Sequence, residues 1–409
     1  MTYKKTIIPL LSIFIFTLGN GLFTTLVSMK LHIDGASSFV IGLITSVYYI
    51  GIMCGSFRTE RFIMIVGHIR AFATFASFLT IITLLQGVFH QNWLWLIFRF
   101  LVGIATAGVF VVIESWLLTL GTHKIRGQLL ALYMVALYLG QSLGQLLINT
   151  TDINTIFPFI FIAILSSFAV IILAMSKITQ PSIEQPSVLG FIKLYRASAS
   201  GMIGSFGSGM ILGSVYGLFP VFLLQYLSYK HNVGLCMFII IFGGMVLQYP
   251  IGRLSDIIER RVVLCTINIS LVVLASLLIF GNFYGFAILI ALMFLFGGAA
   301  FTIYPVSINL TCDNLETQDI VSGVQGLLLA FSVGSALGPS IAAFFIGIPG
   351  NFGLLLYFII IGTLLTGYFL YRRTKKEAVE QEGNFVAMPQ TSPITAELQP
   401  QPAEPPKTN

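Results

Sequence analysis

Trp93–Thr119 reads WLWLIFRFLVGIATAGVFVVIESWLLT, a run of apolar and aromatic residues interrupted by the charges of Arg99 and Glu114. A helix crosses the hydrocarbon core of a bilayer with roughly 20 predominantly apolar residues. A strand of a membrane barrel would instead alternate between apolar and polar residues over about 10 positions. The length and continuity of this run therefore predict a membrane-spanning α-helix.

The rest of the chain repeats this pattern. Only 9% of the 409 residues are charged and 56% are hydrophobic, whereas a soluble globular protein has about 25% charged residues. Because lipid offers the backbone no hydrogen-bond partners, the spans should be helical. Charges, Pro/Gly clusters and polar runs divide the chain into twelve expected spans: 7–29, 39–57, 69–89, 93–119, 128–149, 156–175, 200–224, 232–252, 262–280, 284–308, 321–346 and 350–371.

Lysine and arginine indicate the orientation of these spans, since cytoplasmic loops of membrane proteins are enriched in both. If the two termini lie in the cytoplasm, eighteen of the 21 basic residues fall on that side, Lys30 and Lys230 lie outside, and Arg99 lies within a span. We therefore expect a multi-pass protein of the inner (plasma) membrane, embedded in the lipid bilayer, with both termini cytoplasmic. The net charge of +6 then reflects topology, and no nucleic-acid partner is expected.

Matching motifs indicate two halves of six spans each. The fifth span carries Gly140-Gln-Ser-Leu-Gly144, and the eleventh carries Gly334-Ser-Ala-Leu-Gly338. Small residues four apart lie on one helix face and let two helix backbones approach closely. Internal repetition of this kind is typical of transporters built around a central cavity. The expected organisation is an N-terminal half 1–175, a polar cytoplasmic connector 176–199, a C-terminal half 200–371 and a tail 372–409 whose composition predicts disorder.

A charged motif lies between the eighth and ninth spans: Gly252-Arg-Leu-Ser-Asp256-Ile-Ile-Glu-Arg260-Arg261. A carboxylate placed here can meet a neighbouring helix N-terminus or a cation, and the two arginines can reach acids on adjacent helices. Such contacts could close the cytoplasmic side in one conformation and release it in another. The motif resembles the signature of the major facilitator superfamily, in which a Gly, an Asp four residues later and a basic pair recur.

Further runs are similar to the YcaD-like group of this superfamily, and in order they cover about residues 10–370. The resemblance implies an all-α integral membrane protein with the major facilitator fold, twelve helices in two pseudo-symmetric halves, acting as a proton-coupled or facilitative carrier. The first-half copy of the motif departs from the pattern, because Thr59 holds the carboxylate position with Glu60 beside it. In the second copy, Ile257 and Glu259 replace the usual basic residue and glycine. The similar runs are 112–116, 126–134, 138–147, 212–220, 248–256 and 304–305.

Arg99 and Glu114 are the clearest charges inside a span. At 1.5 Å per residue, Arg99 lies about 9 Å inside the outer end and Glu114 about 22 Å further along the helix. At 100° per residue they lie within about 60° of each other. A charge in hydrocarbon costs roughly 2.5–3.5 kcal/mol on insertion scales, so both should face protein or water. Arg99-x-x-x-Gly103 also resembles an arginine motif associated with proton coupling in drug-exporting facilitators.

Gating contacts are expected near the cytoplasmic ends of the spans. Glu114 should pair there with Arg61 or Arg126, although a proton-carrying or a plain packing role is also open. The acidic loop that holds Asp313 and Asp319 could meet Arg260 or Arg261. The expected gating residues are Arg61, Glu114, Arg126, Gly252, Asp256, Arg260, Arg261 and Asp313.

Polar side chains on the first, fourth, seventh and tenth spans are candidates for the substrate or proton pathway, because these spans line the cavity in the superfamily that the chain resembles. The fifth span adds two more candidates. Any of these side chains could equally form an interhelical hydrogen bond. The candidates are Asn20, Thr24, Arg99, Tyr138, Gln141, Tyr216, Tyr304 and Asn309.

The sequence favours a transporter over an enzyme. It has no nucleotide-binding loop, no nucleophile with an orienting His and no metal-ligand cluster, so we expect no cofactor and no metal, with the proton as coupling ion. Aromatic residues and a single buried cation, Arg99, favour export (efflux) of small uncharged or amphipathic compounds by alternating access in a monomer. A carrier for a sugar or other nutrient, and a non-transporting sensor on the same fold, remain as alternatives.

Overall fold

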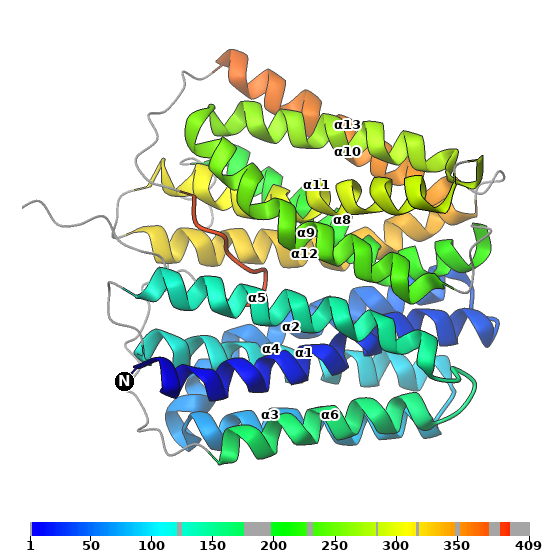
Figure 1. Cartoon of the computed structure of the whole chain (residues 1–409), viewed down its shortest axis with the longest axis vertical. Coiled ribbons are helices and arrows are strands. Elements are labelled where there is room, and N and C mark those ends of the chain that lie inside the picture. The colour runs from blue at the N-terminus through cyan, green and yellow to red at the C-terminus, as the bar shows by residue number, and fades with distance from the viewer. Residues whose placement is uncertain are drawn as a thin grey trace, which may run out of the picture.

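Long helices account for nearly all of the structure, a computed structural model that describes residues 2–120, 125–175, 198–226, 232–283, 285–315, 319–347, 352–375 and 385–392 (Figure 1). Within these ranges, 12 helices are long and apolar enough to cross a membrane, as the hydropathy pattern predicted, and there is no strand. Most of the expected connector, residues 176–197, lies outside the described ranges.

The N-terminal half consists of six spanning helices. Ser37 begins the second of them as a helix cap, because its hydroxyl accepts a hydrogen bond from the backbone N–H of Val40. Pro158 lies in the first turn of the sixth, where a missing N–H leaves no helical bond unmade. The helices are α1 (Thr2–Ile33), α2 (Ser38–Val66), α3 (His68–Val88), α4 (Asn92–Leu120), α5 (Arg126–Leu146) and α6 (Phe157–Ala174), with a short 3-10 turn η1 (Leu147–Thr150) after α5.

The C-terminal half repeats the arrangement, and some of its boundaries differ from the expected ones. α9 continues five residues past Gly252, so Asp256 lies in the last helical turn rather than in a loop. The first half shows the same extension, since α2 runs past Gly55 to Val66. Neither glycine ends its helix. At both positions the missing side chain lets a neighbouring part of the chain pack directly against the helix. The helices are α8 (Ala199–Tyr226), α9 (Val233–Ile257), α10 (Arg260–Ile279), α11 (Phe286–Cys312), α12 (Ile320–Ile346) and α13 (Gly353–Lys375), with η3 (Gly281–Phe283) after α10.

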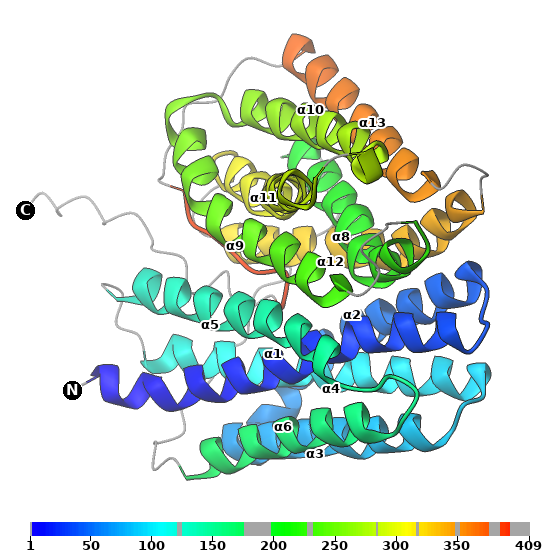
Figure 2. The same cartoon turned by 45° about the vertical axis from the view of Figure 1, so that its right-hand side comes forward.

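The two halves pack their helices in the same way (Figures 1 and 2). α1 packs on α5, α2 on α4 and α3 on α6, and the equivalent pairs α8–α12, α9–α11 and α10–α13 pack in the second half. The spaced glycines lie at two of these contacts, as predicted: a methyl group on Gly144 would overlap the backbone of Leu18, and one on Gly338 that of Met210. Between the halves, α2 packs on α12 and α5 on α9.

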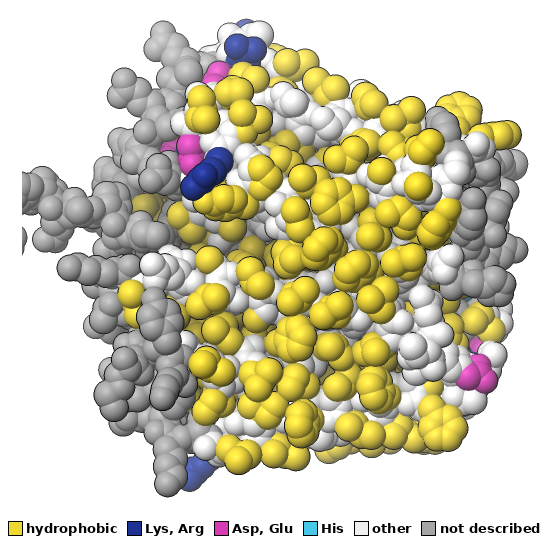
Figure 3. Space-filling view, in the orientation of Figure 1, with side chains coloured by type: hydrophobic (Ala, Val, Ile, Leu, Met, Phe, Trp, Pro, Cys, Tyr) yellow, Lys and Arg dark blue, Asp and Glu magenta, His cyan; other side chains and the backbone are white. Residues whose placement is uncertain are grey.

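The outer surface is suited to lipid. Large apolar side chains such as Ile65, Phe168, Phe344 and Leu364 are exposed on the outside of the bundle, and apolar atoms cover its middle in Figure 3. The dark-blue basic side chains in that view lie toward the end at which α1 begins. We call this end, where α1 begins and α13 ends, the terminal side, and the opposite end the far side.

Part of the expected tail, 372–409, lies within the described ranges. α13 continues to Lys375, and residues 385–392 lie between the two groups of helices (Figures 1 and 2). Met388 is fully buried and Ser392 is 1% exposed. The otherwise polar tail contains a short apolar run, Phe385-Val-Ala-Met388, that can be buried. The other tail residues beyond Lys375 lie outside the described ranges.

Candidate functional site

Arg99 is buried on α4 in a largely aromatic environment. Its guanidinium carbon lies 4.5 Å from the ring centroid of Phe23 and 5.3 Å from that of Tyr48, which is the geometry of cation–π contacts. One terminal nitrogen donates to the Phe23 carbonyl at 3.4 Å, and the other has no hydrogen-bond partner among the described residues. No acid within the described ranges forms an ion pair with Arg99, so its positive charge is not balanced locally.

Glu114 is also fully buried on α4, but its partners differ from those expected. The Tyr133 hydroxyl of α5 donates to Oε1 at 2.5 Å. The hydroxyls of Thr391 and Ser392, from the tail, donate to Oε1 and Oε2 respectively. Neither Arg61, which is exposed, nor Arg126 forms an ion pair with this carboxylate in the described chain. The pairing predicted from the sequence is therefore replaced by three hydroxyl contacts.

Of the polar candidates Asn20, Thr24 and Gln141 on α1 and α5, Asn20 differs from the other two. Asn20 is 6% exposed and its Oδ1 has no hydrogen-bond partner among the described residues, so it remains a candidate for the pathway. The Thr24 hydroxyl bonds within its own helix, to the Gly21 carbonyl at 2.9 Å. Gln141 is half-buried, and its backbone packs against Gly21 where α1 and α5 meet.

An aromatic cluster joins the two halves near the middle of the bundle. The Phe301 ring of α11 lies 5.8 Å from the Tyr138 ring of α5 and 5.9 Å from the Tyr216 ring of α8, both edge-on. Tyr304, also predicted, is 1% exposed and packs on Phe331 at 5.0 Å. Phe301 was missed because one phenylalanine among 36 has no sequence signal that separates it from packing.

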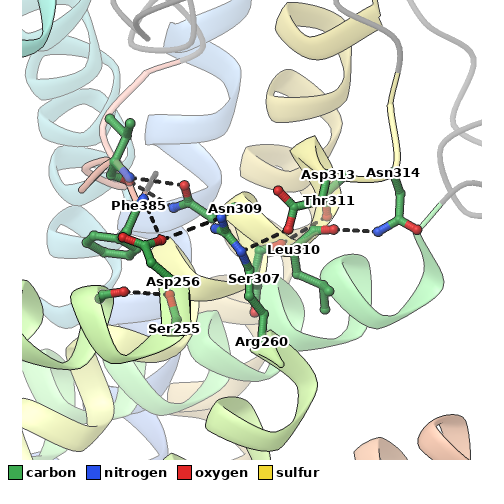
Figure 4. Close-up of polar contacts among 12 residues, drawn as sticks. Ser255, Asp256, Arg260, Ser307, Asn309, Leu310, Thr311, Asp313, Asn314 and Phe385 are labelled. Atoms are coloured by element: carbon green, nitrogen blue, oxygen red, sulfur yellow. Dashed lines mark hydrogen bonds and ion pairs between the residues drawn. The ribbon is translucent and has the colours of Figure 1, made fainter. Parts of the chain in front are cut away.

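The charged motif of the second half forms an ion-pair group around the buried Arg260 at the terminal side (Figure 4). Arg260, 2% exposed, lies 2.8 Å from Asp313 through Nε and 3.7 Å from Asp256 through Nη2. The Arg260–Asp313 contact is one of the pairings expected from the sequence for the acidic loop. Arg261 is 3.9 Å from Glu259, which also lies 3.6 Å from Arg373 of α13. The group ties the ends of α9, α10, α11 and α13 together, and its role in gating stays a prediction.

Asp256 and Asn309 share a further partner, the start of the ordered tail (Figure 4). Asp256 Oδ1 accepts the backbone N–H of Phe385 at 2.7 Å. The Asn309 amide accepts the N–H of Val386 at 3.0 Å and donates to its carbonyl at 2.9 Å. The Phe385 ring lies on Gly252, where a methyl group would overlap it. Five candidate residues from two expected classes thus contact one segment: Gly252, Asp256, Glu114, Tyr138 and Asn309.

The first-half copy of the motif lacks such contacts in the described ranges. The buried Thr59 hydroxyl donates to the Gly55 carbonyl at 2.8 Å, within its own helix. Glu60 lies beyond the part of α2 that can span the membrane, and partial burial raises the pKa of its carboxyl. Arg61 is exposed. Asymmetry between the two copies follows from the missing carboxylate at Thr59.

A model of the Major Facilitator Superfamily matches residues 10–328 and again 201–402. The chain belongs to the major facilitator superfamily. Its relatives include the uncharacterized MFS-type transporter YcaD of Escherichia coli O17:K52:H18 (strain UMN026 / ExPEC), 32% identical over 375 residues that cover 90% of this chain and 95% of the relative. YcaD of Shigella flexneri serotype 5b (strain 8401) matches with the same identity and coverage.

Solved structures of this superfamily share the fold of this major facilitator. A mutant form of the nucleoside transporter NupG superposes with a TM-score of 0.74 at 14% identity, covering 90% of this chain and 98% of that one. A bacterial homologue of the human lysosomal transporter Spinster, inward-facing and unoccupied, superposes with a TM-score of 0.70 at 13% identity, covering 91% and 97%. Family and relatives identify this chain as a YcaD-like, multi-pass membrane transporter rather than an enzyme.

Removing the charge of Asp256 is expected to slow transport several-fold without loss of folded protein. In Asp256→Asn the side chain keeps an oxygen that can accept the Phe385 N–H, but Arg260 loses one of its two acidic neighbours. Initial rates in proteoliposomes measure the effect, and Thr59→Ala is the matched control because the first copy has no carboxylate to lose. Wild-type rates in both variants would rule out a gating role for Asp256.

Proposed function

We propose that this transporter exports small uncharged or amphipathic compounds by alternating access, with the proton as coupling ion. The observation that supports this substrate class is the aromatic cluster of Tyr138, Phe301 and Tyr216, which links the two halves at the expected pathway. Aromatic rings offer apolar area and polar edges to an amphipathic compound. A dianionic metabolite would require two or more buried cations along the pathway. Arg99 is the single cation that the sequence predicts on that pathway.

Proton coupling is proposed from the two buried charges of α4. Ionisable residues inside a membrane are rare, and they commonly mark ion paths and proton relays. Arg99 carries a charge that no described acid balances, and Glu114 is a carboxylate held by hydroxyls rather than by a cation. Neither arrangement is a closed salt bridge, so a moving proton or ligand would not have to displace a paired countercharge at either group. A single chain is the transport unit, and it uses no further cofactor.

Transport assays in proteoliposomes test this function. Purified protein is reconstituted, a pH gradient is imposed, and the movement of uncharged amphipathic dyes, nucleosides and sugars is followed with protein-free liposomes as control. We expect at least one amphipathic compound to move against its gradient and a protonophore to stop that movement. Movement of a sugar or nucleoside, with none of the amphipathic compounds transported, would replace export by nutrient uptake. Failure of every compound would favour the sensor alternative.

The terminal side is proposed to face the cytoplasm of a cell whose inner membrane holds the protein. Fusions of a reporter that is active only outside the cytoplasm should be active after residues 34, 152 and 230 and inactive after 190 and 376. The physical reason is the partition of lysine and arginine between the two sides. Full-length fusion protein on immunoblots controls for expression. Activity after residue 190 would overturn this orientation.

A further inference from the structure

The ordered tail segment, residues 385–392, connects the two halves of the transporter at the terminal side. In Figures 1 and 2 it runs as a red trace between the N-terminal and C-terminal groups of helices. Its first residues contact α9 and α11 of the C-terminal half, through Asp256 and Asn309. Its last residues contact α4 and α5 of the N-terminal half, through Glu114 and Tyr138. One short segment therefore bridges four helices.

The C-terminal half holds the segment by its backbone. The Asn309 side-chain amide forms a pair of hydrogen bonds with Val386: it accepts one from the backbone N–H and donates one to the backbone carbonyl. Asp256 accepts a hydrogen bond from the backbone N–H of the preceding residue, Phe385. These contacts are made to backbone groups of the segment, and Gly252 leaves the space that the Phe385 ring fills.

The N-terminal half holds the segment by its side chains. The Tyr138 hydroxyl donates to Gln390 Oε1 at 3.0 Å. Thr391 and Ser392 donate their hydroxyls to opposite oxygens of Glu114, and both residues are buried. A fully buried carboxylate needs hydrogen-bond donors, because leaving it unpaired costs several kcal/mol. Two of the three donors that Glu114 receives come from the tail.

The far side of the bundle is closed by contacts between the halves themselves. Ser46 of α2 and Ser340 of α12 lie 2.8 Å apart, and the rings of Phe39 and Phe344 lie 5.3 Å apart. In alternating access these contacts open while the halves approach each other on the terminal side. The tail segment lies between the two halves on the terminal side. The halves can therefore close there only if the segment leaves or moves with them.

We propose that residues 385–392 act as an autoinhibitory plug, an internal ligand that occupies the terminal-side path and favours the conformation closed on the far side. A ligand that binds one conformation better shifts the population toward it. A tethered ligand acts at an effective concentration of the order of mM. The plug covers Tyr138 and Asn309, two expected pathway residues, so a transported compound and the plug compete for the same contacts. Transport thus requires release of the segment, which makes the tail a regulator of this carrier.

A pair of full-length variants tests the plug. Thr391→Val with Ser392→Ala removes both hydroxyls on Glu114 and changes side-chain volume little. Thr391→Ser with Ser392→Thr keeps both hydroxyls and serves as the matched control. The probe is a fluorescent synthetic peptide of sequence FVAMPQTS, and its binding to purified protein in detergent is measured by fluorescence anisotropy. We expect the hydroxyl-free variant to bind the peptide at least tenfold more tightly than the wild type and the control variant, because its own segment no longer fills the site.

The outcomes separate this inference from the proposed function. Equal peptide affinity in all three proteins, or no binding to the hydroxyl-free variant, would overturn the plug. A peptide carrying valine and alanine in place of its Thr-Ser pair should bind the hydroxyl-free variant at least tenfold more weakly, which ties the signal to Glu114. Peptide binding needs no transported compound, so failure to find a substrate leaves this test intact. Where a substrate is found, the hydroxyl-free variant should transport it faster than the wild type.

Discussion

Arg99→Ala is expected to abolish gradient-driven transport, with at least a tenfold loss of the initial rate. The guanidinium is a fixed positive charge deep in α4, packed over the rings of Phe23 and Tyr48. One of its terminal nitrogens has no hydrogen-bond partner in the described chain, so the group keeps a donor for a moving ligand. Alanine removes both the charge and the donor. The measurement is uptake or release in proteoliposomes under an imposed pH gradient.

Two further variants separate charge from shape at this position. Arg99→Lys keeps the positive charge but loses the planar fork of donors, so partial activity would show that charge is what counts. Arg70→Ala removes an exposed arginine near the start of α3 and should leave the rate unchanged. Loss of the cation–π contacts alone would cost about 0.5–2 kcal/mol of stability, so thermal unfolding in detergent is measured in parallel. Full transport by Arg99→Ala would make this residue a packing arginine.

The twelve spans could be predicted because the constraint that sets them is local. A segment in lipid must satisfy its own backbone, so a continuous apolar run is enough to predict a helix. The close contact at Gly144 was predictable for the same reason, since spacing on one helix face needs no knowledge of the partner. Helix ends were less predictable, as the continuation of α9 through Gly252 shows. Glycine is a poor stop signal where another part of the chain packs onto it.

Partners distant in sequence could not be predicted from the motifs. Glu114 was expected to meet an arginine because charge complementarity is the simplest local argument, whereas its donors lie on α5 and in the tail. Asp256 lies in the last turn of α9 rather than in the expected loop, and its contact with Phe385 joins residues 129 positions apart. The run Phe385–Met388 in an otherwise polar tail was the one available signal. Average composition concealed it, because four apolar residues change the mean of a long tail very little.

Asp313→Asn is expected to destabilise the folded transporter by up to about 3–5 kcal/mol, the range for breaking a buried ion pair. Arg260 is 2% exposed, and its Nε lies 2.8 Å from Asp313, so the variant leaves a buried cation short of its nearer acid. Asp256, at 3.7 Å, offsets part of the loss. Thermal unfolding of the purified protein in detergent measures the change.

A double-mutant cycle assigns the effect to the pair itself. Arg260→Met combined with Asp313→Leu removes both charges, and replacing a buried pair by apolar residues is often neutral or stabilising. We therefore expect the double variant to be more stable than the single variant Asp313→Leu, with a coupling energy outside the roughly 0.5 kcal/mol that additive sites show. Arg373→Gln is the control, since this arginine is 55% exposed in its contact with Glu259 and should change stability by less than about 1 kcal/mol. Additive effects in the cycle would mean that Arg260 and Asp313 stabilise the terminal side independently, and the ion pair could not then act as one gating unit.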